Sequence, residues 1–170
     1  MSKRAKSAKF AALATVAALA AVTTFAGTAS AGGPSTSPYN CVDTRGGAFT
    51  AKVTYSTGGG VLKVSIARSI PIGFPANSIN TTVLFNGPSG GVVYDGAINP
   101  PYPASSPVLN LGAIPKVSGT ISPGQPLNAV LTGTPPSPSN WSLRVLFPTG
   151  SWPSWYCVTR TPLTPPLTYN

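Results

Sequence analysis

The chain has 170 residues, with 11 Lys and Arg, 2 acidic residues, no His, 20 Pro, 18 Gly and 2 Cys. The two acidic residues are Asp43 and Asp95, so Glu is absent as well as His. These counts exclude Ser-His-Asp and Cys-His catalysis and leave few groups for acid–base work or metal binding, so we expect no enzyme, no metal and no cofactor.

Residues 1–31 have the three regions of a secretory signal peptide. Residues 1–9 carry four basic side chains, residues 10–27 are apolar and rich in Ala, and Ala29 and Ala31 occupy the small-residue positions of a cleavage site. An uncleaved membrane anchor is the alternative, but threonines interrupt an apolar stretch that is already short for a membrane span. We therefore expect cleavage after Ala31, and a secreted, extracellular product.

Removal of the signal peptide changes the charge of the chain. Four basic residues leave with it, so residues 32–170 carry seven basic and two acidic residues, a net charge of +5. The seven are scattered along the chain, whereas a nucleic-acid-binding protein concentrates Lys and Arg in a run or on one face. We therefore predict no nucleic-acid partner. The remaining chain has no second apolar stretch, so we also expect no membrane span.

The two cysteines predict one disulfide. Cys41 lies near the start of the mature chain and Cys157 near its end. An exported chain with two cysteines is expected to oxidise them, although two free thiols or an intermolecular pair are the alternatives. A Cys41–Cys157 bond would bring the first and last ordered segments side by side.

The mature chain alternates strand patterns with turn residues. Residues 48–57 and 61–68 alternate apolar and polar side chains with period two, and Gly58, Gly59 and Gly60 separate them, which predicts a β-hairpin. Shorter β-like runs follow, and Pro and Gly fall between them. They lie at 79–85, 92–94, 108–111, 116–121, 127–132, 141–147 and 155–160.

These runs predict an all-β fold. Seven to nine short strands with such punctuation favour a single antiparallel β-sandwich, immunoglobulin-like and closed by the disulfide, with a β-barrel as second choice. We expect the domain to span residues 39–160. Residues 32–38 and 161–170, which are rich in Pro, Gly, Ser and Thr, are expected to be flexible tails.

Aromatic residues are the remaining candidates for function. Trp141 and Trp155 fit inward strand positions, whereas Trp152 and Tyr102 lie in Pro-containing loops, and Tyr156 lies on the face opposite Trp155. Exposed loop aromatics can stack on sugars or anchor a protein partner. They can equally cap the end of a hydrophobic core.

In size, basic charge and few surface tryptophans, the chain resembles small secreted sugar-binding modules. The sequence thus predicts a secreted, non-catalytic binding or adhesion module that recognises an extracellular polysaccharide or a protein. Trp152, Tyr102 and Tyr156 are its candidate ligand contacts. The alternative is a structural or interaction protein of the cell envelope with no small-molecule ligand.

Overall fold

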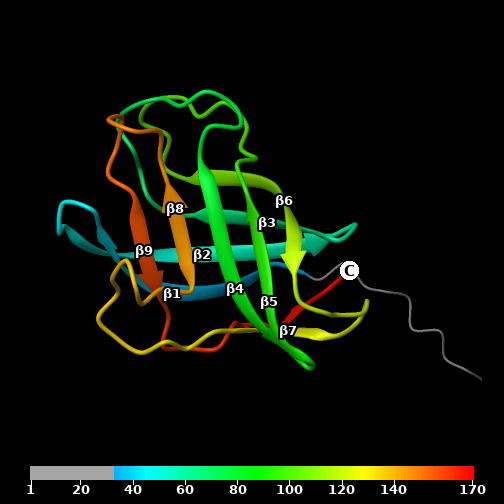
Figure 1. The fold of residues 1–170 in the computed structure, drawn as a ribbon. Helices are drawn as coiled ribbons and strands as arrows, with labels where there is room; N and C mark the ends of the chain where they lie inside the picture. Colours follow the sequence, from blue (N-terminus) through cyan, green and yellow to red (C-terminus); the bar gives the residue numbers. More distant parts are fainter. Residues whose placement is uncertain (1–32) are drawn as a thin grey trace, which may run out of the picture.

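The computed structural model describes residues 33–170, which form ten β-strands and no helix (Figure 1). The signal peptide and its cleavage residues Ala29 and Ala31 lie outside the described residues. Residues 33–170 contain no helix that could cross a membrane. The strands are β1 (Ser35–Asp43), β2 (Ala48–Gly58), β3 (Val61–Ile66), β4 (Asn80–Gly87), β5 (Gly90–Gly96), β6 (Leu109–Ser118), β7 (Pro126–Ala129), β8 (Leu143–Leu146), β9 (Trp155–Val158) and β10 (Leu167–Thr168).

Eight of these strands close into an antiparallel barrel. Their order around the ring is β1, β2, β3, β6, β5, β4, β8 and β9, and β9 pairs again with β1. In Figure 1, β1, β2 and β3 run across the view behind the upright strands β4, β5, β8 and β9. The short strands β7 and β10 extend the sheet beside β4.

The expected immunoglobulin-like sandwich is therefore wrong, and the second choice, a barrel, is confirmed. Two pairings close the ring: β4 bonds to β8 as well as to β5, and β1 bonds to β9 as well as to β2. Inward and outward side chains alternate in the same way in a sandwich and in a small barrel. The alternation could therefore predict the strands but not how the sheet closes.

The first hairpin illustrates why the sequence forms these strands. β2 and β3 pair as predicted, with Gly58 opposite Val61, so that Gly59 and Gly60 form a two-residue turn. Both glycines have positive φ angles, 61° and 80°, the conformation that a tight hairpin turn requires and that glycine adopts without steric cost.

Aromatic side chains fill the barrel. Tyr55 contacts Tyr39 and Phe85 edge to face, with ring centroids 6.2 and 5.3 Å apart, and Phe85 contacts Tyr94 in the same way at 5.9 Å. Burial raises the pKa of the Tyr39 hydroxyl to about 12, an effect that the neighbouring hydroxyls of Tyr55 and Ser142 partly oppose. Burial also raises the pKa of the Tyr55 hydroxyl well above its usual value.

Both segments that were expected to be flexible tails contain strands. β1 begins at Ser35, and the side chains of Ser35 and Ser37 are buried. Near the other terminus, Leu163 and Leu167 are buried in the core, and β10 pairs with β7. Residues 35–38 therefore belong to barrel strand β1, and the C-terminal segment packs on the core through Leu163 and Leu167.

Candidate functional site

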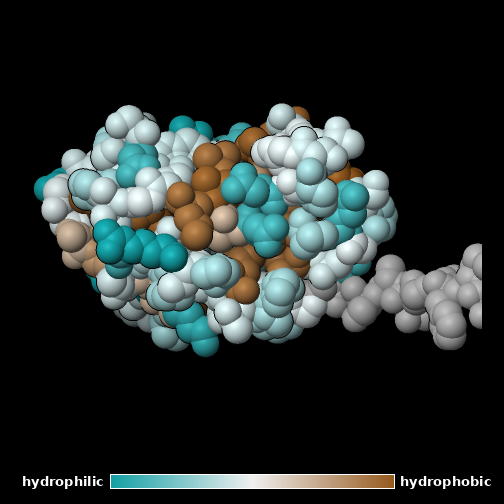
Figure 2. All heavy atoms as spheres, turned by 90° about the horizontal axis from the view of Figure 1, so that it is seen from below, coloured by the Kyte–Doolittle hydropathy of each residue, from teal (hydrophilic) through white to brown (hydrophobic). Residues whose placement is uncertain are grey.

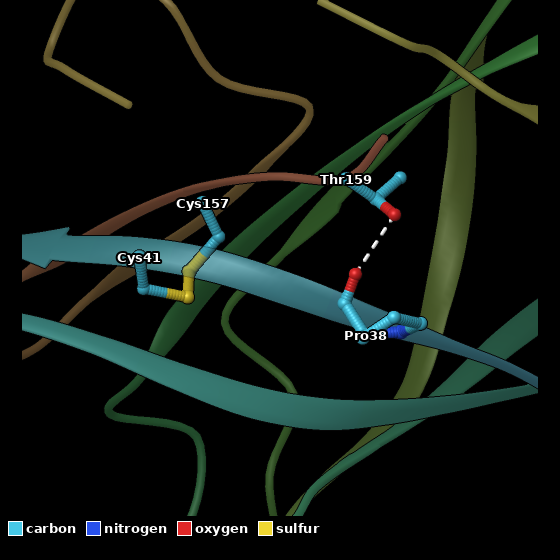
Figure 3. The surroundings of a disulfide bond; sticks show 4 residues. All are labelled: Pro38, Cys41, Cys157 and Thr159. Carbon is cyan, nitrogen blue, oxygen red and sulfur yellow. Dashed lines mark hydrogen bonds between the residues drawn. A yellow bond between two sulfur atoms is a disulfide. The ribbon is translucent and has the colours of Figure 1, made fainter. Parts of the chain in front are cut away.

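The disulfide joins two neighbouring barrel strands. Cys41 of β1 lies directly opposite Cys157 of β9, and their Cα atoms are 4.0 Å apart (Figure 3). Further along the same pair of strands, the hydroxyl of Thr159 donates a hydrogen bond of 2.8 Å to the carbonyl oxygen of Pro38. The predicted disulfide is confirmed, and the first and last segments of the domain do lie side by side.

Outward side chains of β2, β1 and β9 form the surface that we call the outer face. Because strand side chains alternate, residues next to the inward Cys41, Ala51 and Cys157 point away from the core. The register aligns them in two rows across the three strands. One row is Thr50, Asn40 and Val158, and the other is Ala48, Val42 and Tyr156. Val158 is 0% exposed, so it contributes no open surface to the first row.

An open depression of about 300 Å³ lies on this outer face. Its lining comes from Asn40, Cys41, Ala48, Phe49 and Thr50 of the barrel and from Pro136 of the segment between β7 and β8. The lining surface is mainly apolar, and Asn40 and Thr50 supply an amide and a hydroxyl. This combination suits a ligand with one apolar side and hydrogen-bonding groups at its edge.

The wall that contains Pro136 is held in place by hydrogen bonds. The backbones of Ser137 and Asn140 exchange two hydrogen bonds of 2.9 and 3.0 Å, and the Asn140 side chain donates to the carbonyl oxygen of Pro135 at 2.7 Å. The guanidinium of Arg160 donates to the hydroxyl of Thr134. Residues 134–140 therefore form a compact turn that is fastened to the chain just after β9.

Tyr156 and Arg144 extend the outer face beyond the depression. They are directly opposite each other on β9 and β8, where same-face side chains are neighbours. The Arg144 guanidinium lies over the Trp141 ring, 4.6 Å from its centroid, and its Nη2 donates a 3.0 Å hydrogen bond to Thr82 Oγ1. The two contacts fix the guanidinium beside the half-exposed Tyr156.

The three aromatic ligand candidates have different surroundings. Tyr156 lies on the outer face, half-buried, as its strand phase predicted. Trp152, in the segment between β8 and β9, is half-buried and packs partly against the core. Tyr102 is only 5% exposed, so the expectation that it presents an open ring is wrong.

Tyr102 belongs instead to the aromatic cap at the upper end of the barrel. Its backbone exchanges hydrogen bonds of 2.8 and 2.9 Å with Phe74, and its hydroxyl donates to the carbonyl oxygen of Ser106 at 2.6 Å. Phe74 in turn contacts Phe147, with ring centroids 5.0 Å apart. Tyr102 therefore caps the core, which is one of the two roles that the sequence allowed. It does not form an exposed surface together with Trp152.

The two tryptophans that were expected in the core also differ. Trp155 is 2% exposed and contacts Phe49 and Phe147 with ring centroids 5.1 and 5.0 Å apart, as predicted. Trp141 is half-exposed beneath Arg144, because β8 begins only at Leu143 and Trp141 precedes the alternating part. The sequence places Arg144 and Tyr156 outward, but their strand register, which makes them neighbours, is visible only in the structure.

The outer face combines aromatic and hydrogen-bonding groups. Residues 33–170 contain no group of three or more His, Cys, Asp or Glu side chains that could hold a metal ion. A half-exposed phenol, a fixed guanidinium, an amide and a hydroxyl can together stack on a ring and donate or accept hydrogen bonds.

A comparison with known proteins finds no matching family model, no matching curated protein and no matching solved structure.

Proposed function

We propose that the protein is a non-catalytic binding module that recognises an extracellular polysaccharide through its outer face. The observation that carries this proposal is the position of Tyr156, which lies beside Arg144 and next to an apolar depression edged by Asn40 and Thr50. A sugar ring has an apolar face and a rim of hydroxyl groups. An aromatic ring with nearby amide, hydroxyl and guanidinium groups complements both parts.

The fold supports an extracellular site for this module. A cross-strand disulfide persists in oxidising compartments, which agrees with the signal peptide predicted for residues 1–31. The disulfide also ties β1 to β9, the two strands that carry Asn40 and Tyr156. The proposed binding groups therefore lie on a covalently linked pair of strands and are held in place before any ligand arrives.

The proposal is tested by retention on insoluble polysaccharides and by affinity electrophoresis in soluble ones. Tyr156→Ala should weaken binding about tenfold, the effect expected for an aromatic side chain at the centre of a contact. Trp152→Ala is the matched control, because Trp152 is also half-buried but belongs to the segment between β8 and β9. Binding that depends on Trp152 and not on Tyr156 would contradict the assignment to the outer face.

A second candidate is an interaction protein of the cell envelope. Figure 2 shows hydrophobic residues gathered across the underside of the molecule. Large exposed hydrophobic side chains include Leu131, 52% exposed in the segment after β7, and Val117, 57% exposed on β6. Exposed apolar patches are typical of protein contacts. Failure to bind any polysaccharide, together with concentration-dependent self-association that Leu131→Asp abolishes, would favour this second function.

A further inference from the structure

Basic residues flank the outer face on two opposite sides. Lys52 of β2 pairs with Pro38 of β1, in the row that follows Asn40 and Thr50 on the side away from Tyr156. Arg160 comes two residues after Val158, is exposed, and donates a hydrogen bond to Thr134 in the turn that contains Pro136. On the opposite side, Arg144 lies beside Tyr156.

The spacing of these charges leaves a neutral centre. Tyr156 and Arg160 are four residues apart, a separation of at most about 13 Å. Asn40, Thr50 and the apolar depression lie between the two charged sides. A ligand that covers the whole face would therefore meet positive charge at both ends and uncharged polar groups in the middle.

The two acidic side chains of the chain have other partners. Asp43 Oδ1 accepts hydrogen bonds of 2.8 Å from the backbone nitrogens of Arg45 and Gly47, in the turn between β1 and β2. Asp95 Oδ1 accepts a 2.5 Å hydrogen bond from the hydroxyl of Thr82. Neither carboxylate contacts Lys52 or Arg160 through these bonds, so the charges of these two residues are available to a ligand. Arg144 donates to the same Thr82 hydroxyl that bonds to Asp95, so Asp95 offsets part of its charge.

We propose that the ligand of the outer face is an acidic polysaccharide, one whose sugar units carry carboxylate groups; this inference rests on the proposed function. Arg144 on one side and Lys52 and Arg160 on the other bind carboxylates. Tyr156 stacks on the sugar ring between them, and Asn40 and Thr50 hydrogen-bond to its hydroxyl groups. The planar guanidinium groups of the two arginines match carboxylate geometry.

A nucleic acid fits this face less well. Its backbone carries closely spaced charges, and proteins that bind it commonly neutralise six to ten phosphates. The outer face offers three basic side chains, and a fourth, Arg68, lies over the ring of Phe49, which lines the depression. Four charges are fewer than such a protein commonly uses.

The test compares two polymers with the same sugar backbone. Polygalacturonate carries one carboxylate per unit, and fully methyl-esterified polygalacturonate carries none. Affinity electrophoresis and calorimetry with the disulfide-bonded chain, residues 32–170, should show binding to the acidic polymer that is at least about tenfold tighter and weakens with added salt. Equal binding to both polymers overturns this inference but leaves the proposed function standing, whereas binding to no polysaccharide overturns both.

Charge variants locate the effect on the surface. Lys52→Gln combined with Arg160→Gln should weaken binding to polygalacturonate about fivefold to tenfold, because it removes two exposed charges. Arg160→Lys, which keeps the charge but not the guanidinium bond to Thr134, separates the charge from the support of the Pro136 turn. Lys63→Gln is the matched control, since Lys63 is an exposed outward residue of β3. Urea unfolding shows that each variant keeps its fold. Equal losses in the double variant and the control, or equally tight binding of single-stranded DNA, would overturn the assignment.

Discussion

The inner and outer sides of β1 and β9 differ in almost every physical respect, although their residues alternate along the same two strands. The inner side holds the Cys41–Cys157 disulfide and Trp155, all at most 2% exposed. The outer side presents Asn40 and Tyr156 to solvent beside a depression. Neighbouring residues such as Tyr156 and Cys157 therefore differ in their surroundings. If the proposed function is correct, substitutions on the inner side should lower stability, and substitutions on the outer side should lower binding with little loss of stability.

The largest expected effect comes from removing the disulfide on the inner side. The bond closes a loop with a sequence separation of 116 residues. Replacing both cysteines with Ala should lower the free energy of unfolding by about 4 to 5 kcal/mol, mainly because the unfolded chain gains freedom. Urea unfolding at pH 7 measures this loss, and reduction of the native protein should reproduce it. A loss below about 1 kcal/mol would contradict a stabilising role for this bond.

The next effect contrasts two adjacent side chains of β9. Trp155→Ala should cost about 3 to 5 kcal/mol, because it leaves a cavity between Phe49 and Phe147. Tyr156→Ala should cost less than about 1 kcal/mol, since that side chain is half-exposed on the outer face. Chemical unfolding of the two variants side by side measures the contrast. Similar losses of unfolding free energy in the two variants would show that Tyr156 also packs against the core.

Much of this inner side could be predicted from the sequence. The hairpin of β2 and β3, the burial of Trp155 and the disulfide follow from period-two alternation and from the number and spacing of cysteines. β1 was not predicted as a strand, because Ser35 and Ser37 are polar residues that become buried only when β9 and the C-terminal segment cover them. Ser37 Oγ lies 2.7 Å from Thr159 Oγ1 and 2.9 Å from Thr161 Oγ1, and neither contact leaves a signal in the sequence.

The outer face was less predictable, because it depends on register and on loop packing. Strand phase places Tyr156 and Arg144 outward, but only the pairing of β8 with β9 makes them neighbours. Tyr102 lies among prolines, which are typical of an exposed loop, yet its pairing with Phe74 carries it into the core. Local patterns predict where a side chain can point, whereas contacts between distant segments decide what it meets.

Alkaline pH should lower stability through the buried Tyr39 of the inner side. The pKa of Tyr39 is about 12 in the folded barrel against about 10 in the unfolded chain, so the folded state retains the hydroxyl proton to higher pH. The contribution of protonated Tyr39 to the free energy of unfolding is therefore fully present below pH 10. It falls by about 2 to 3 kcal/mol as the pH rises to 12. Urea midpoints between pH 9 and 12 should fall, and Tyr39→Phe should reduce the slope. Constant stability up to pH 12 would contradict the burial of this hydroxyl.

The smallest expected effect concerns two Arg–aromatic pairs, which differ in whether the aromatic ring also packs against the core. The Arg144 guanidinium covers Trp141 at the surface, whereas Arg68 covers Phe49, whose ring also packs against Trp155 inside the barrel. In double-mutant cycles, both pairs should show a coupling energy of about 0.5 to 1 kcal/mol, typical of exposed cation–π contacts. The single variant Phe49→Ala should nevertheless cost more than Trp141→Ala, because only Phe49 has a partner in the core. Equal single costs would mean that Trp141 too packs against the core. The contrast between a stabilising inner side and an outer face proposed to bind ligand would then hold for β1 and β9 but not for the β8 side of the barrel.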